Sequence, residues 1–245
     1  MNESENNKLL KLRKIRQACG LGSLSTPEQL GKYWVATDPV RTVQIGLRNS
    51  IKETLHAKTD VHILVYGHPG CGKSTELSKL VQELEEECLT VKFSILSEMD
   101  MMHPRGDDLL LVLTERLLHT ARERGFAPSD SDLKSVYEYF STVTRSTTQS
   151  RESELGMSAE AGAGTGFFDA FLNLMVGIKS EIKLNVHSTE TKVAELRKRP
   201  ADLVQQVNIV INAVRQKIPR HLRLLFIVED LDKRSEERRV GKECR

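Results

Sequence analysis

The chain has 245 residues, enough for one large domain or two small ones, and its formal net charge at pH 7 is only +2. No apolar run approaches the roughly 20 residues of a membrane-spanning helix, and the polar, acidic start is unlike a signal peptide. The four cysteines show neither metal-ligand spacing nor a disulfide framework, which predicts a reducing, cytoplasmic location.

The first 58 residues are predicted to form a helical N-terminal segment. Residues 8–19 carry leucines among lysines and arginines, the pattern of a basic amphipathic helix. The cap and first turn of a short helix are predicted at Thr26, Pro27 and Glu28. An extended piece at 33–35 and another helix over 39–58 are expected to follow. The aromatic residues here are predicted to belong either to the core or to a binding site. Four residues just before the next predicted strand are the candidates for such a site: Tyr33, Trp34, Val35 and Arg41.

A glycine loop then lies between an apolar run and a helix. Residues 61–66 (VHILVY) predict a buried parallel strand, and leucines at helical spacing predict a helix over 73–87. The residues between them match the phosphate-binding pattern G-x-x-x-x-G-K-[ST]. Glycines allow the backbone N–H groups to form an anion nest, at which the helix points its positive end. The predicted phosphate-binding residues are Gly67, His68, Pro69, Gly70, Cys71, Gly72, Lys73, Ser74 and Thr75.

Two side chains of this loop have expected roles of their own. Lys73 would place its ammonium against the β- and γ-phosphates, and Ser74 would offer its hydroxyl to Mg²⁺. The alternative is an ordinary glycine-rich turn. The order of strand, loop and helix favours a nucleotide-phosphate site.

The middle of the chain is predicted to be mostly helical. A strand over 90–96 has one covered and one wetter face, and helices are expected over 106–124 and 131–143. Residues 145–166, rich in Ser, Thr, Gly and Ala, predict a flexible loop, and the apolar patch 167–178 a buried helix or hairpin. A last helix covers 200–218. We interpret about 125–200 as an insertion within a core of 59–233.

An apolar strand at 221–228 ends in the acids Glu229, Asp230 and Asp232. Acids at the carboxyl end of a buried strand sit where α/β sheets bind ligands. Together with the upstream glycine loop, this resembles a Walker B element, in which Glu229 holds Mg²⁺ through water and Asp230 polarises the attacking water. Two alternatives stay open: a shifted register, with Asp230 facing the metal and Asp232 helping, and a charged strand exit without function. The predicted catalytic residues are therefore Lys73, Glu229 and Asp230, and the predicted metal contacts are Ser74 and Glu229.

With GHPGCGKSTEL at 67–77 and EDLDK at 229–233, the chain resembles bacterial AAA-type ATPases of the STAND and origin-recognition branch. The resemblance implies an α/β P-loop NTPase fold, a three-layer αβα sandwich with a parallel sheet, that binds ATP and Mg²⁺. Because many P-loop ATPases cover the adenine with the segment before the first strand, the resemblance also makes Tyr33, Trp34, Val35 and Arg41 candidates for an adenine contact. It also implies a regulatory switch that hydrolyses ATP, with a homo-oligomer and an unidentified protein partner or signal. The alternatives are a P-loop kinase or other phosphotransferase, and a weakly hydrolysing, nucleotide-responsive scaffold associated with DNA.

Residues 234–245 (RSEERRVGKECR) resemble a translated sequencing adapter. We therefore expect this tail to be non-native and the ATPase core to be truncated after the strand at 221–228. The tail holds five basic and three acidic residues, which leaves 31 basic and 31 acidic residues, and so a net charge of zero, in the rest of the chain. The charge thus does not support a general affinity for nucleic acid.

Overall fold

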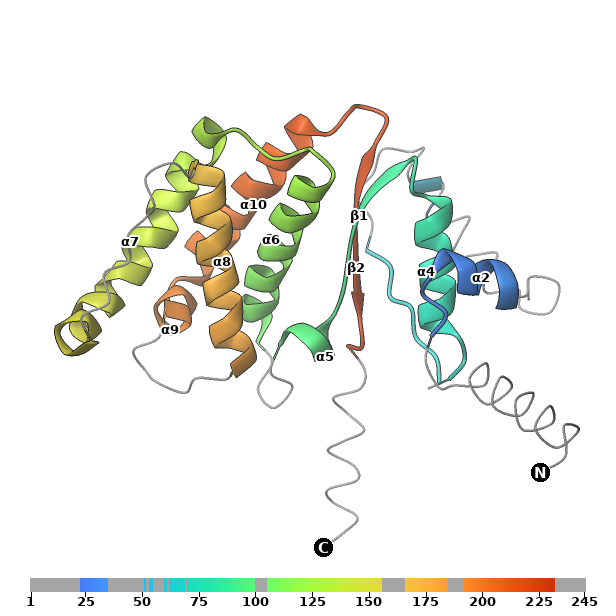
Figure 1. The fold of residues 1–245 in the computed structure, drawn as a ribbon, viewed down its shortest axis with the longest axis horizontal. Helices are drawn as coiled ribbons and strands as arrows, with labels where there is room; N and C mark the ends of the chain where they lie inside the picture. The colour runs from blue at the N-terminus through green and yellow to red at the C-terminus, as the bar shows by residue number, and fades with distance from the viewer. Residues whose placement is uncertain are drawn as a thin grey trace, which may run out of the picture. The chain divides into compact units, whose positions relative to one another are not determined.

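The computed structural model describes residues 23–34, 51, 53–54, 60, 62–68, 70–99, 105–155, 166–184 and 192–231. The chain divides into two compact units, Met1–Glu86 and Glu87–Arg245, and Figure 1 shows their elements. This division cuts through the range 59–233 that the sequence suggests as the core. The predicted domain limits stay predictions.

In the first unit, helix α2 (Pro27–Tyr33) begins where the sequence predicts. The Thr26 side chain accepts a hydrogen bond from the backbone N–H of Gln29 at 3.2 Å, and the Gln29 side chain reaches back to the Thr26 backbone. Pro27 occupies the first turn, where its missing N–H costs nothing. The expected extended piece starts one residue late, since Tyr33 is still helical and Trp34 is extended.

The prediction of a strand over 61–66 is wrong for residues 62–66, and residue 61 lies outside the described residues. Residues 62–68 have no regular secondary structure, and Leu64 and Tyr66 are 75% and 87% exposed. An extended segment becomes a strand only when its N–H and C=O groups pair with a neighbouring strand. The described residues of this unit contain no strand that could supply that ladder. The helix predicted over 73–87 is confirmed as α4 (Lys73–Glu83), although it ends earlier, at the C-cap Leu84.

The second unit holds two parallel strands, β1 (Cys88–Ser94) and β2 (Arg223–Glu229), paired from Cys88↔Arg223 to Ser94↔Glu229. Figure 1 shows its larger helices gathered on one side of this sheet. The helices are α5 (Ile95–Glu98), α6 (Gly106–Glu123), α7 (Asp130–Leu155), α8 (Phe167–Leu184), α9 (Lys192–Arg197) and α10 (Pro200–Lys217).

The two faces of the sheet differ, as the alternation in the sequence predicts. Leu89, Val91 and Phe93 of β1 belong to the buried core shared with the helices. Because side chains alternate along a strand, Lys92 and Ser94 lie on the opposite face. Glu229 at the end of β2 pairs with Ser94 and so lies on this second face as well.

The helices predicted over 106–124 and 200–218 are confirmed as α6 and α10, and the apolar patch at 167–178 is a helix, α8. The flexible loop predicted over 145–166 is wrong for 145–155, because α7 continues to Leu155. Residues 145–155 contain neither Gly nor Pro, and their Ser and Thr only weaken helix propensity. No helix in the described ranges is both long and apolar enough to cross a membrane.

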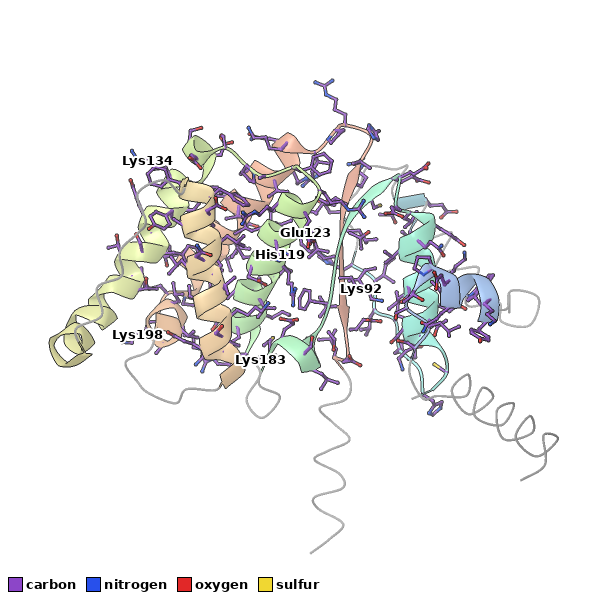
Figure 2. All side chains as sticks on the ribbon, viewed as in Figure 1. Lys92, His119, Glu123, Lys134, Lys183 and Lys198 are labelled. Carbon is purple, nitrogen blue, oxygen red and sulfur yellow. The ribbon has the colours of Figure 1, made fainter. Side chains whose placement is uncertain are left out.

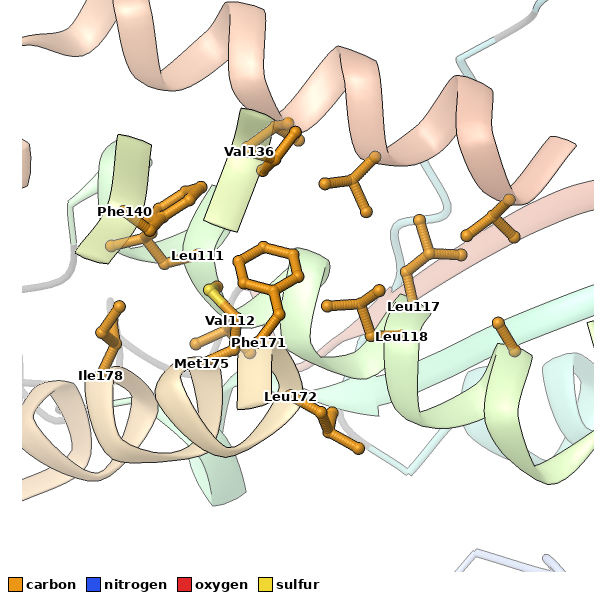
Figure 3. Packing of buried hydrophobic residues seen from close by; sticks show 14 of the residues in the cluster. Leu111, Val112, Leu117, Leu118, Val136, Phe140, Phe171, Leu172, Met175 and Ile178 are labelled. Carbon is orange, nitrogen blue, oxygen red and sulfur yellow. The ribbon is translucent and has the colours of Figure 1, made fainter. Parts of the chain in front are cut away.

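The core of the second unit lies between its helices (Figure 3). Phe140 of α7 and Phe171 of α8 are fully buried, with ring centroids 5.5 Å apart and planes tilted by 44°. Aliphatic side chains of α6 and α8 surround this pair, among them Leu111, Leu118 and Met175. Aromatic contact and burial together make this pair a major support of the helical layer.

A buried charge network joins α5, α6 and α8. Lys179 Nζ lies 2.9 Å from Glu98 Oε2 and 3.0 Å from Glu115 Oε2, and Arg116 donates a hydrogen bond to Glu98. Burial alone would raise the pKa of Glu98, but hydrogen bonds from Lys179 and Arg116 outweigh it and leave this pKa below its usual 4.5. The network fixes α5, the element that directly follows β1.

The mixed α/β class and the parallel pairing of strands are confirmed. The three-layer arrangement concerns both units together and stays a prediction, as does the truncation. The predicted helix at 8–19, most of that at 39–58 and the tail 234–245 lie outside the described residues.

Replacing Phe171 by Ala is expected to lower the free energy of unfolding by about 3–5 kcal/mol, because it opens a cavity beside Phe140. Chemical denaturation followed by circular dichroism would measure this. Phe167→Ala is a matched control, since Phe167 is 41% exposed and touches Tyr137 only edge-on, at 5.8 Å between centroids. It should cost about 1 kcal/mol. Equal losses in the two variants would contradict the core position of Phe171.

Glu98→Gln should change how stability depends on pH. A lowered folded-state pKa means that the carboxylate stabilises the fold above its unfolded-state pKa of 4.5 and loses this effect as pH falls through the folded value. The wild type should thus exceed Glu98→Gln in stability at about pH 7, and the difference should shrink as pH drops below about 4.5. Urea unfolding across this range would show it, with the exposed Glu138→Gln as control. A difference that stays constant with pH would contradict the network.

Candidate functional site

The glycine loop lies in the first unit and leads directly into α4. Gly70 and Gly72 have φ angles of 78° and 90°, in the left-handed region that glycine adopts at little cost. Between them, the backbone N–H of Cys71 donates to the carbonyl oxygen of His68 at 3.2 Å. Pro69 lies outside the described residues. The backbone conformation of this turn therefore needs the glycines that the motif supplies.

Lys73 folds back over the loop that precedes it. Its Nζ donates to the carbonyl oxygens of Gly67, at 2.7 Å, and His68, at 3.3 Å. A Cβ atom added at Gly67 would lie only 3.0 Å from the Sγ of Cys71. The loop is thus tightly closed, and the ammonium is kept beside its backbone.

The start of α4 presents backbone donors. Its N-cap, Gly72, has no side chain with which to accept from the first-turn N–H groups. These groups and the helix dipole make the end electropositive. Lys73 and Ser74 are the first two residues of the helix, so an ammonium and a hydroxyl join the same end. This donor set and the tight glycine turn fit a phosphate group.

The segment around α2 is tied to the first turn of α4. The backbone N–H of Leu24 donates to Thr75 Oγ1 at 3.2 Å, and Trp34 Nε1 donates to Glu76 Oε1 at 3.1 Å. Lys79 Nζ lies 5.5 Å from the centre of the Trp34 ring. Of the candidates for an adenine contact, Trp34 is thus half-buried against α4, Tyr33 is exposed, and residues 35 and 41 lie outside the described ranges.

The acids lie in the second unit, at the carboxyl end of β2. Asp230 directly follows the strand with φ 65°, a left-handed conformation that Asp adopts more readily than most residues. Its Oδ2 accepts a hydrogen bond from the hydroxyl of Ser94, the last residue of β1. Ser94 also occupies the N-cap of α5, yet its side chain makes no capping bond there. The hydroxyl instead fixes Asp230.

Glu229, the last residue of β2, is held by Lys92 of the neighbouring strand β1. Lys92 Nζ lies 3.3 Å from Glu229 Oε2, and the two side chains are 26% and 14% exposed. The other carboxylate oxygen, Oε1, is buried without a hydrogen-bond partner in the described part of the chain. A carboxylate with one vacant oxygen, followed by a second acid, has the oxygen chemistry that Mg²⁺ prefers. Asp232, on which the shifted register depends, is not among the described residues, so that alternative is untested.

The sequence did not point to Lys92, Ser94 or Leu24. The sequence contains part of the information for Lys92 and Ser94, because alternation along the strand places both side chains on one face. What is missing from the sequence is the parallel register with β2, which brings that face to the acids. Leu24 contributes its backbone N–H. Because every residue except proline has this group, the identity of the residue gives no indication of the contact.

Comparison with known proteins places these observations in a family. The model of the KAP family P-loop domain matches residues 46–240, a range that includes both the glycine loop and the acids. No curated protein and no solved structure matches the chain. The narrower resemblance to the STAND and origin-recognition branch stays a prediction. Because the family model covers well over half of the sequence, this chain belongs to the KAP family of P-loop NTPase domains.

Proposed function

We propose that this protein binds ATP with Mg²⁺, hydrolyses it, and acts as a regulatory switch. The observation that carries the proposal is the glycine loop: left-handed Gly70 and Gly72 lead into a helix without a side-chain cap, with the Lys73 ammonium held over the loop. Such a set of donors suits a polyphosphate. Membership in a P-loop NTPase family supports nucleotide binding independently.

The chain's own residues have separate tasks in this reaction. The loop amides and Lys73 would bind the phosphates, and the Ser74 hydroxyl and Glu229 would hold the metal. When bound, Mg²⁺ would supply positive charge that offsets the charge of the phosphates. Asp230, oriented by Ser94, positions the attacking water in line with the γ-phosphorus.

The loop and the acids lie in different units, and their action on one nucleotide is part of the proposal. The family match supports it, since one domain model spans both. The choice of ATP over GTP, a homo-oligomer and a cytoplasmic location follow from the resemblance and the cysteine usage described above.

The role as a switch has support within the first unit. Thr75 and Glu76, in the first turn of α4, accept hydrogen bonds from Leu24 and Trp34. A phosphate that shifts the start of α4 would therefore pull on the segment that carries α2. Nucleotide state can in this way be passed to residues outside the loop.

Lys73→Ala should weaken ATP binding by roughly 100-fold or more, because it removes a charged contact to the phosphates. Titration with a fluorescent ATP analogue, in competition with ATP and GTP, would measure this in the full chain. Lys134→Ala is the control, since Lys134 is an exposed lysine on α7, away from the loop in the sequence. Similar affinities of wild type and Lys73→Ala would refute the phosphate site.

Asp230→Asn should keep ATP binding and reduce phosphate release by roughly 10²–10⁴-fold. Asn also tolerates the left-handed backbone and still accepts a bond from Ser94, so the geometry is preserved. Phosphate release without an added acceptor is the readout, with Asp202→Asn on the exposed face of α10 as control. Unchanged turnover would contradict the role of Asp230, and ATP consumption only in the presence of an acceptor would favour a phosphotransferase.

A further inference from the structure

Lys92 makes an ion pair on the face of the sheet that is turned away from the helical core. Figure 2 labels it on β1, away from the helices that carry Lys134 and Lys198. Its partner is Glu229, at 3.3 Å between Nζ and Oε2, and most of both side chains is shielded from solvent. The contact is diagonal across the strands, because Lys92 pairs with Ile227, two residues before Glu229.

The pair leaves one polar atom unsatisfied. Glu229 Oε1 is buried without a hydrogen-bond partner in the ranges described, and so is Thr90 Oγ1 on the same face of β1. Buried acceptors are normally paired, because desolvation without a partner is costly. Glu229 is thus half compensated: the Lys92 ammonium holds one oxygen, and the other oxygen lacks an electropositive partner among the described residues.

We propose that Lys92 stands in for the divalent cation at Glu229 while metal is absent, and thereby keeps the acid from binding metal without nucleotide. This inference rests on the proposed function, in which Glu229 is a metal contact. Lys92 is a positioning residue in this scheme, because it acts through Glu229.

The physical reason is charge. A divalent cation that approaches Glu229 meets an ammonium already bound to the same carboxylate, and the two cations repel. The pair and the metal therefore compete for Glu229, and by linkage whatever stabilises the ion pair weakens metal binding equally. Nucleotide phosphates bring negative charge that offsets this repulsion. Metal should then enter together with the nucleotide.

The test measures metal binding rather than turnover. Binding of Mn²⁺ to the full chain is followed by electron paramagnetic resonance of the free ion, with and without a non-hydrolysable ATP analogue. Lys92→Met should tighten nucleotide-free Mn²⁺ binding about tenfold, within the usual range of coupling. Lys92→Arg, which keeps the charge, should remain within about twofold of the wild type, and so should the exposed Lys134→Met.

Glu229 must carry this effect if the inference is correct. Glu229→Gln should weaken Mn²⁺ binding, and adding Lys92→Met to it should then change nothing further. A second readout is unfolding in EDTA, where Lys92→Met should be less stable than the wild type; added Mn²⁺ should remove this difference. Lys92→Gln serves in place of Lys92→Met should the latter fail to fold.

Unchanged or weaker Mn²⁺ binding in Lys92→Met or Lys92→Gln would overturn the inference, since it would mean that Lys92 is neutral or helps to hold the metal. The proposed function would survive that result as long as Lys73→Ala still loses ATP and Asp230→Asn still loses hydrolysis. If Glu229→Gln binds Mn²⁺ as the wild type does, both the inference and the metal role of Glu229 fail.

Discussion

The acidic end of the second unit depends on one constraint, the parallel register of β1 and β2. Pairing Ser94 with Glu229 brings the carboxyl ends of both strands to the same edge. A slip by one residue would turn Lys92 and Ser94 to the core face and bury a charge there. The apolar residues on the other face, such as Val91 and Phe93, lock this register by their burial. The hydrophobic core thus determines which polar side chains reach the acids.

The helices support this edge from the far side of the sheet. α6 packs on β1, and the charge network of Glu98, Glu115, Arg116 and Lys179 ties α5 to α6 and α8. Because α5 begins directly after Ser94, the network also fixes the end of β1. A buried network of this kind gives little net stability compared with apolar packing, but its hydrogen bonds and ion pairs are satisfied in only one arrangement of the side chains. This arrangement fixes α5 and therefore the position of Ser94.

The phosphate loop is built differently, from local chemistry. Two left-handed glycines, an uncapped helix start and the Lys73 contacts all arise within a few residues of one another. The bonds from Leu24 and Trp34 tie the start of α4 to a segment distant in the sequence.

The sequence by itself determined what is encoded locally: the phosphate loop, the Thr26 cap, the periodic helices α6 and α10, and acids after an apolar strand. Tertiary structure alone decided which side chains hold those acids, since Ser94 and Asp230 are 136 residues apart and meet only through the strand pairing. It also decided the state of residues 62–66. Their β-branched pattern favours a strand, but a strand exists only where a neighbour completes its hydrogen bonds, and no short stretch of sequence can specify that neighbour.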